Sequence, residues 1–218
     1  KELTDAAVSW LAATGPDPFF LYLHYMDPSA PYQAPDPWYD MFVPEENTST
    51  LEGRASELGE FYHGASYTAE DVEKLVALYE GEIAYWDSEF IRIPEALQDQ
   101  GLEENTVLVV MSDHGEQFAE HDSWKHEHLW QENIHVPLVL SVPGATPGRV
   151  SNQVSLIDVA PTLSTLIDVP GWEAWQGADL SGFLVGNTEM ESRHLFSEFV
   201  PSWAVLAPDG WKAHSERL

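Results

Sequence analysis

The sequence predicts an α/β fold, in which short apolar strands alternate with helices. Continuous apolar runs of strand length occur at residues 19–25, 106–111 and 136–142. A long stripe of apolar residues at helical spacing lies between the first two runs, and a second helical segment follows the third. The order strand, helix, strand, loop, strand, helix is typical of a sheet with parallel members that is flanked by helices.

The first quarter of the chain is expected to hold one helix, one strand and a long loop. A helix is expected over residues 4–13, where Thr4 is a suitable cap and apolar residues recur every three or four positions. Gly-Pro-Asp-Pro at 15–18 ends this helix. The run FFLYLHY at 19–25 predicts a buried strand, because it is apolar without interruption. Residues 27–67 are rich in proline, glycine and acids and predict a long irregular excursion, a feature that is often functional.

The middle of the chain is expected to hold a long helix and two buried strands. Apolar residues recur at helical spacing over residues 71–100, and Pro94 is expected to kink this helix or split it in two. Gly101 is a natural residue to end it. The runs TVLVVM at 106–111 and VPLVLSV at 136–142 follow as strands.

The last part of the chain predicts a helix and short strands. The helix is capped by Asp158 and runs to residue 168. Residues 195–199 and 203–206 have the composition of short strands. Asp-Gly at 209–210 then indicates a turn into a further strand that has only begun.

The composition excludes several classes of protein. The chain has 218 residues, of which 44% are apolar, enough for one sizeable domain or two small ones. It holds 37 acidic and 9 basic residues, a net charge of −28, which excludes nucleic acid and anionic membranes as non-specific partners. We interpret this charge as a solvated acidic surface, in preference to a field that attracts cations, because the acids are spread along the whole chain. The sequence has no cysteine and no apolar run long enough to cross a bilayer.

The ends of the sequence suggest a piece of a longer protein. The chain begins at Lys1 without an initiator methionine or a signal segment, and it stops a few residues after a turn. We therefore expect an interior piece, with room for a signal peptide upstream. The compartment stays unknown, although the absence of cysteine fits a periplasmic or extracellular protein.

The segment Ser-Asp-His-Gly-Glu directly after the strand at 106–111 is the strongest sign of a functional site. Ligands of open α/β sheets bind beyond the carboxyl ends of strands. Asp113 offers a hard oxygen and His114 a nitrogen, a pair that suits a divalent metal. In the alternative, Asp113 caps a turn and His114 bonds to the backbone, and the dipeptide alone slightly favours that alternative.

Five of the nine histidines lie between residues 114 and 135, which raises the weight of the functional interpretation. In the sequence WKHEH, Lys125 stands beside His126, and His128 lies two positions further on. A positive loop in an acidic protein suits an oxyanion substrate, with lysine as a point charge and histidine as an acid. A functional role is favoured for His126 and Lys125 and is evenly balanced for His128. The histidines His121 and His135 are expected to be structural.

His24 lies late in the first predicted strand and is a further candidate. It faces the same cleft if the two strands are parallel neighbours, and it is equally compatible with a satisfied core histidine.

Taken together, these segments resemble the sulfatase family of the alkaline phosphatase superfamily. The resemblance covers about residues 17–199 and rests on a combination of pieces in the family's order. These pieces are PFFLYLHYMDPSAPY (18–32), YEGEIAYWDSEF (79–90), NTVLVVMSDHGEQFAEH (105–121), HLWQENIHVPLVLSVPG (128–144) and VSLIDVAPTL (154–163).

The resemblance implies an alkaline-phosphatase-like, mixed and largely parallel sheet flanked by helices, here incomplete. Residues 1–190 would form part of the catalytic domain, and residues 191–218 would begin a small carboxy-terminal strand region. It also implies a sulfuric ester hydrolase. Alternatives on the same fold are a phosphodiester or phosphonate monoester hydrolase, a phosphoethanolamine transferase, and a catalytically inactive homologue.

The resemblance also assigns roles to residues. Asp113 and His114 match the metal ligands, with calcium the usual ion and manganese or zinc left open by the histidine. In the substrate loop, His126 is the first choice for the group that protonates the leaving oxygen and Lys125 the second. Ser29 stands where the family often has a histidine that contacts the sulfate. Either His24 takes over the role of that histidine, or the subsite is built differently.

The family's nucleophile is missing from this sequence. Sulfatases use a formylglycine made in a Cys/Ser-x-Pro-x-Arg motif, and no such motif occurs here. We therefore expect the formylglycine and further metal-binding carboxylates outside this chain, and no activity from the piece alone. The expected partner is a small-molecule or carbohydrate sulfate ester, for which Trp124 and Trp130 are candidate stacking residues beside the loop.

Overall fold

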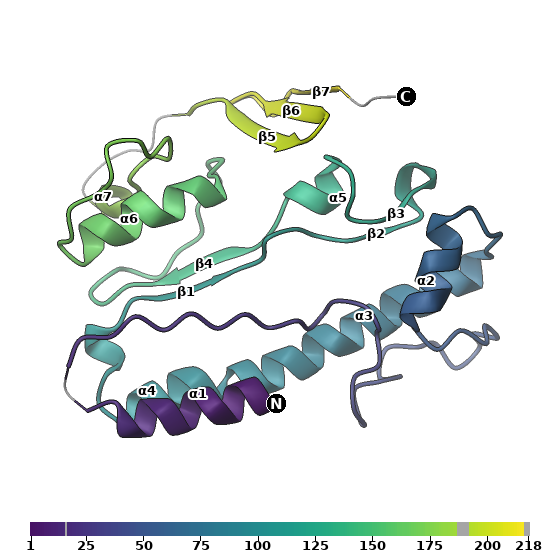
Figure 1. The fold of residues 1–218 in the computed structure, drawn as a ribbon, viewed down its shortest axis with the longest axis horizontal. Helices are drawn as coiled ribbons and strands as arrows, with labels where there is room; N and C mark the ends of the chain where they lie inside the picture. Colours follow the sequence, from purple (N-terminus) through teal and green to yellow (C-terminus); the bar gives the residue numbers. More distant parts are fainter. Residues whose placement is uncertain (16, 187–191, 216–218) are drawn as a thin grey trace. The chain divides into compact units, whose positions relative to one another are not determined.

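A computed structural model describes residues 1–15, 17–186 and 192–215 of the chain (Figure 1). The chain divides into two compact units, each made of two stretches of sequence. The first unit holds Lys1–Glu103 and Gln117–Lys125, and the second holds Glu104–Glu116 and His126–Leu218. The boundary predicted between residues 190 and 191 falls outside the described residues and stays a prediction.

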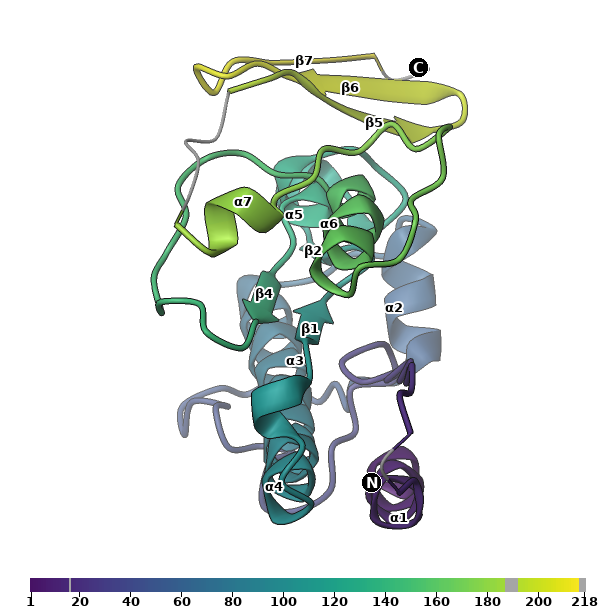
Figure 2. The ribbon, with the colours of Figure 1, turned by 90° about the vertical axis from the view of Figure 1, so that its left-hand side faces the viewer.

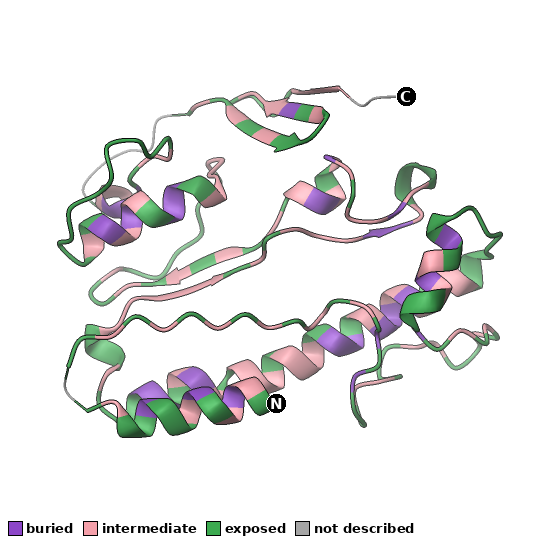
Figure 3. Cartoon of the chain, viewed as in Figure 1, coloured by how far each residue is buried: buried purple, intermediate pink, exposed green. Residues whose placement is uncertain are grey.

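Two helices of the first unit pack on each other through apolar faces. Helix α1 (Glu2–Ala13) follows the predicted span closely, and it packs against α4 (Arg92–Asp99). Figure 3 shows buried residues spaced along both helices. The shared core consists of Ala7, Leu11, Ile93, Ala96 and Leu97.

The long helix is split in two, as Pro94 predicted. Helix α3 (Ala69–Phe90) ends at Ile91, and α4 begins directly afterwards. Pro94 lies in the first turn of α4, where a missing N–H costs no hydrogen bond. Gly101 ends α4 with a φ of +64°, which confirms its expected role.

The irregular excursion expected at residues 27–67 contains a helix that the sequence interpretation missed. Helix α2 (Ala55–Tyr62) is short and contains Gly59, so its propensity signal is weak. It is stabilised by burial of Leu58 and Phe61 and by the Arg54 N–H, which donates to Glu57 at its first turn.

Helix α2 contributes to a second core, with α3 and a small hairpin. Strands β2 (Gln117–Phe118) and β3 (Trp124–Lys125) pair antiparallel around the short helix η2 (Glu120–Asp122). Trp124 is 2% exposed and stacks on Phe61 with ring centroids 5.0 Å apart. The expectation that Trp124 stacks on a sugar is therefore wrong, because its faces are covered by protein.

The segment at 19–25 differs from the buried strand that its composition predicted. Residues 19–25 are extended but form no strand within the first unit. Phe19, Leu21 and Leu23 pack on the core that α1 and α4 share, whereas the alternate residues Phe20 and Tyr22 are 81% and 63% exposed. An apolar run does not by itself reveal whether both faces are covered.

In the second unit, the two predicted strands pair directly with each other. Strand β1 (Leu108–Met111) runs antiparallel to β4 (Leu138–Ser141), and Met111 lies opposite Leu138. Both strands are only partly buried. The largely parallel pairing is not found in this part of the protein, because every strand pair among the described residues is antiparallel.

The remaining helices of the second unit are short. They are α5 (Gln131–Ile134), η3 (Leu156–Asp158), α6 (Val159–Leu166) and α7 (Ser181–Leu184), and η1 (Glu103–Asn105) lies at the boundary of the two units. Asp158 precedes α6 as expected, but its side chain accepts hydrogen bonds from the N–H groups of Ser155 and Ala178 and pairs with Arg193. Its carboxylate therefore fixes loops, and does not cap α6.

The second unit ends in a three-stranded antiparallel meander (Figure 2). Strands β5 (Leu195–Phe199) and β6 (Ser202–Leu206) confirm the two predicted strands, and β7 (Lys212–Ser215) follows the predicted turn. Gly210 has a φ of +86°, a value that favours glycine.

Candidate functional site

The segment after β1 forms a compact turn. The Ser112 hydroxyl donates to the His114 carbonyl at 2.6 Å, and the His114 N–H donates to Asp113 Oδ1 at 3.0 Å. The turn-capping role that we considered for Asp113 is therefore present. It does not exclude ligation, because the Asp113 side chain is still 73% exposed.

Gly115 places this turn against α5. Its N–H donates to the Asn133 carbonyl at 2.8 Å. A Cβ added at Gly115 would lie 2.0 Å from the Glu132 carbonyl oxygen, so any other residue would force the backbone apart. The sequence needs a glycine here for close approach, and the contact fixes the residues on both sides.

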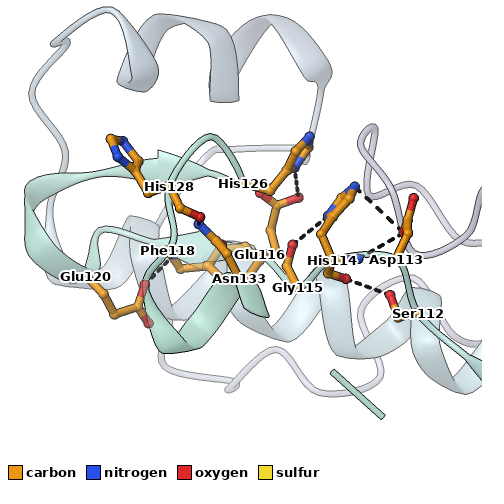
Figure 4. Close-up of polar contacts among 10 residues, drawn as sticks. All are labelled: Ser112, Asp113, His114, Gly115, Glu116, Phe118, Glu120, His126, His128 and Asn133. Carbon is orange, nitrogen blue, oxygen red and sulfur yellow. Dashed lines mark hydrogen bonds and ion pairs between the residues drawn. The ribbon is translucent and has the colours of Figure 1, made fainter. Parts of the chain in front are cut away.

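The ring of His114 is oriented by its own turn (Figure 4). Its Nδ1 lies 2.8 Å from the Gly115 carbonyl oxygen, which only accepts hydrogen bonds. In a neutral ring, Nδ1 therefore carries the proton and Nε2 carries the lone pair, the usual arrangement in a histidine ligand.

Asp113 and His114 direct their donor atoms to the same side. Asp113 Oδ1 lies 3.8 Å from His114 Nε2, and the His114 side chain is 41% exposed. One hard oxygen and one imidazole nitrogen at this separation fit a divalent metal. Across the described residues, no cluster of three or more candidate ligands occurs.

His126 lies on top of His114. The two rings stack with centroids 3.9 Å apart and planes inclined by 22°. Of the two histidines in the WKHEH loop, His126 is thus in contact with the turn after β1.

Glu116 completes this cluster and was missed by the sequence interpretation. Both of its carboxylate oxygens lie 3.3 Å from His126 Nδ1, and its side chain is only 8% exposed. The sequence signal that could have revealed Glu116 is its position directly after Asp-His-Gly, close to the proposed metal ligands.

Lys125 makes a different contact from the one expected. Its ammonium lies 4.6 Å from the centre of the Tyr62 ring, a cation–π contact inside the first unit. Its backbone has a φ of +68°. Its catalytic role stays a prediction.

The structure gives the other candidate histidines different surroundings. The carbonyl of His128 accepts from the Asn133 side chain at 3.1 Å, and Figure 4 shows its ring away from His114 and His126. His24 belongs to the first unit, where its Nδ1 lies 3.4 Å from the Tyr22 hydroxyl. His121 lies in η2, and His135 ends α5, positions compatible with structural roles.

Comparison with protein families gives one match. The model described as Sulfatase covers residues 1–169. This chain belongs to the sulfatase family. The family is part of the alkaline phosphatase superfamily, so the expected membership is confirmed.

The relatives of this sulfatase chain are longer proteins. It is 30% identical over 230 aligned positions to arylsulfatase K of Gallus gallus, an alignment that covers 94% of the chain and 42% of that relative. It is 27% identical to the phosphonate monoester hydrolase from Silicibacter pomeroyi, with a TM-score of 0.76 and coverage of 89% and 43%. The chain therefore spans less than half of each of these two proteins.

A third likeness shows the fold alone. The structure of BT4656 with its substrate D-glucosamine-2-N,6-O-disulfate has a TM-score of 0.66 at 17% identity and covers 95% of this chain and 58% of that one. These likenesses confirm the mixed α/β, alkaline-phosphatase-like class. No helix within the described ranges is long and apolar enough to cross a membrane.

The position that departs from the family pattern lines a hollow in the first unit of the sulfatase chain. Ser29 borders a space of about 400 Å³ together with Asp27, Glu82 and Tyr85. Glu82 is 3% exposed, and burial, with the neighbouring charge of Asp27, raises the pKa of its carboxyl to about 7. A carboxyl that is half protonated near neutral pH was not anticipated from the sequence.

Proposed function

We propose that this chain supplies the metal-binding turn and the general acid of a sulfuric ester hydrolase. The observation that supports this proposal is the stacking of His126 on His114 at 3.9 Å. This stacking brings a candidate acid, His126, into contact with a candidate metal ligand, His114, which follows β1. The membership of the sulfatase family supports the proposed reaction class.

Asp113 and His114 would hold one divalent ion. Calcium is our first choice, and manganese or zinc fits the imidazole nitrogen equally well. A bound ion there supplies Lewis acidity and orients the ester oxygens. Further ligands and the formylglycine nucleophile are proposed to come from residues outside these 218.

His126 would act as the acid. Glu116 lies beside Nδ1, so the opposite nitrogen, Nε2, is the one proposed to donate a proton to the leaving ester oxygen. Lys125, His128 and His24 remain candidates for contacts with the substrate. The substrate class that we propose is a small-molecule or carbohydrate sulfate ester, in line with the sulfated sugar bound by BT4656.

A second candidate is hydrolysis of a phosphonate monoester or phosphodiester. It is favoured by the 27% identity to the phosphonate monoester hydrolase and by Ser29 at the position of the usual sulfate-contacting histidine. Both reactions use the same metal turn and the same acid, so Asp113 and His126 cannot discriminate them. The choice depends on the charge and shape of the group that the whole site accepts.

The test uses the full-length protein that contains this chain. Wild type, Asp113→Ala and His126→Ala are assayed with an aryl sulfate and an aryl phosphodiester, and metal content is measured by mass spectrometry. We expect Asp113→Ala to lose bound metal and turnover, and His126→Ala to keep the metal and lose about 100- to 10,000-fold in rate. Asp99→Ala, at the exposed end of α4, serves as the control. Unchanged activity of Asp113→Ala would reject the metal assignment, and a preference for the phosphodiester would favour the second candidate.

A further inference from the structure

Glu116 is a buried acid whose carboxylate faces one nitrogen of His126. Its side chain is 8% exposed, and both oxygens lie 3.3 Å from Nδ1. Burial of an ionised carboxylate costs free energy unless a hydrogen bond or an opposite charge offsets it. The His126 ring supplies a donor at this point, so the two side chains stabilise each other's orientation.

A single buried residue of α5 holds both segments that carry this pair. The Asn133 carbonyl accepts from the N–H of Gly115, the residue before Glu116. The Asn133 side chain, in a residue that is 2% exposed, donates to the carbonyl of His128, two residues after His126. The backbone is therefore anchored to Asn133 one residue before Glu116 and two residues after His126.

The stack with His114 restricts the same ring in a second direction. A face-to-face contact at 3.9 Å fixes the plane of the His126 ring but leaves it free to turn within that plane. The Glu116 carboxylate removes this freedom, because only one ring nitrogen can point at it. Plane and in-plane direction together determine where Nε2 lies.

We propose that Glu116 is a positioning residue for His126, which directs the proton of Nε2 toward the leaving oxygen of the substrate. The inference rests on the proposed function, because it assumes that His126 is the acid. Glu116 acts through the ring and does not touch the substrate. In this arrangement the carboxylate lies beside Nδ1, and the direction of the ring determines where Nε2 lies.

The leaving group of the substrate distinguishes this role from a merely structural one. A proton donor matters for a basic leaving oxygen and matters little for one that departs as a stable anion. Phenyl sulfate and para-nitrophenyl sulfate provide this contrast. In the full-length protein, we expect Glu116→Gln to lower kcat for phenyl sulfate by roughly 10- to 100-fold, with a much smaller loss for para-nitrophenyl sulfate and little change in KM.

A double-mutant cycle gives the sharper test. If Glu116 acts through His126, Glu116→Gln has no further effect on kcat in a His126→Ala background. Glu120→Gln is the control, because Glu120 lies between Glu116 and His126 in the sequence but accepts from the backbone N–H of Phe118. Equal losses for both substrates, or losses that multiply in the double variant, would overturn the proposal.

Two further measurements cover the remaining outcomes. If the melting curve shows that Glu116→Gln is unfolded, Glu116→Asp, which keeps the charge and shortens the reach, enters the same cycle. If the wild type hydrolyses neither aryl sulfate, the proposed function has failed, and the inference is tested without turnover. Nitrogen-15 shifts of the His126 ring should then indicate protonated Nδ1 in the wild type and a changed tautomer population in Glu116→Gln. Identical shifts in the two proteins would refute the positioning role.

Discussion

The imidazole of His126 lies face to face with that of His114, with ring centroids 3.9 Å apart. The two residues come from different loops of the second unit. A metal on Asp113 and His114 and a protonated His126 would place positive charge on both sides of this stack. The Glu116 carboxylate, 3.3 Å from His126 Nδ1, would offset that repulsion.

The identity of the metal should depend on His114. We predict that His114→Asn, which replaces an imidazole nitrogen by an amide oxygen, raises the bound fraction of calcium relative to manganese and zinc. The measurement is the metal content of full-length protein purified with equal concentrations of the three ions. His121→Asn, in η2, is the matched control and should leave the metal content unchanged. The same metal content in His114→Asn and wild type would show that His114 is not a ligand.

The stability of the first unit should depend on pH through Glu82. Burial raises the pKa of Glu82 from 4.5 to about 7, so the folded state binds the proton more tightly than the unfolded state. Its stabilising effect is complete below about pH 4.5 and disappears as the pH rises toward 7. We expect Glu82→Gln to remove up to about 3 kcal/mol of pH dependence.

The measurement for Glu82 is the difference in unfolding free energy between wild type and variant at a series of pH values. Taking the difference cancels the contributions of titrating groups that do not interact with Glu82. Backbone N–H groups of Gln33 and Ala34 also bond to this carboxyl, and the Asp27 side chain shares a hydrogen bond with it. A difference that stays constant between pH 4.5 and pH 7 would contradict the raised pKa.

Gly81 should tolerate no side chain, although it lies inside helix α3. A Cβ at this position would lie 2.3 Å from the Trp38 carbonyl oxygen, which belongs to the backbone and cannot yield easily. We predict that Gly81→Ala destabilises the protein by about 2 to 3 kcal/mol, despite the better helix propensity of alanine. The check is denaturant unfolding.

Gly59 in helix α2 is the matched control for Gly81. An added Cβ there meets nothing within 4 Å. Gly59→Ala should stabilise the protein by roughly 0.4 to 1 kcal/mol, because alanine reduces the freedom of the unfolded chain. Equal effects of the two substitutions would show that the close approach at Gly81 carries no cost.

Asp158 should be essential for folding of the second unit. Its carboxylate is fully buried, pairs with Arg193 and accepts from the N–H groups of Ser155 and Ala178. Asp158→Ala leaves these three donors without their partner, and we expect a loss of about 3 to 5 kcal/mol. Thermal and denaturant unfolding measure it, with the exposed Asp99→Ala expected within about 0.5 kcal/mol of wild type. A similarly small effect of Asp158→Ala would contradict a structural role.

Local signals in the sequence predicted much of the secondary structure. Pro94 and Gly101 correctly located the break and the end of the long helix, because both act on their own backbone within one turn. Helix α2 was missed because its stability comes from burying Leu58 and Phe61 in a core built by distant residues. The burial of Trp124 could not be foreseen for the same reason.

The sequence by itself determined where the site begins, because an acid and an imidazole directly after an apolar strand are local and readable along the chain. Only the tertiary structure decided that His126, and not His128 of the same loop, stacks on His114, and that Glu116 faces His126 (Figure 4). The physical reason is that these contacts join segments that are distant in the sequence. His126 stacks on His114, and Asn133 forms hydrogen bonds with Gly115 and His128, so both contacts depend on how the second unit packs.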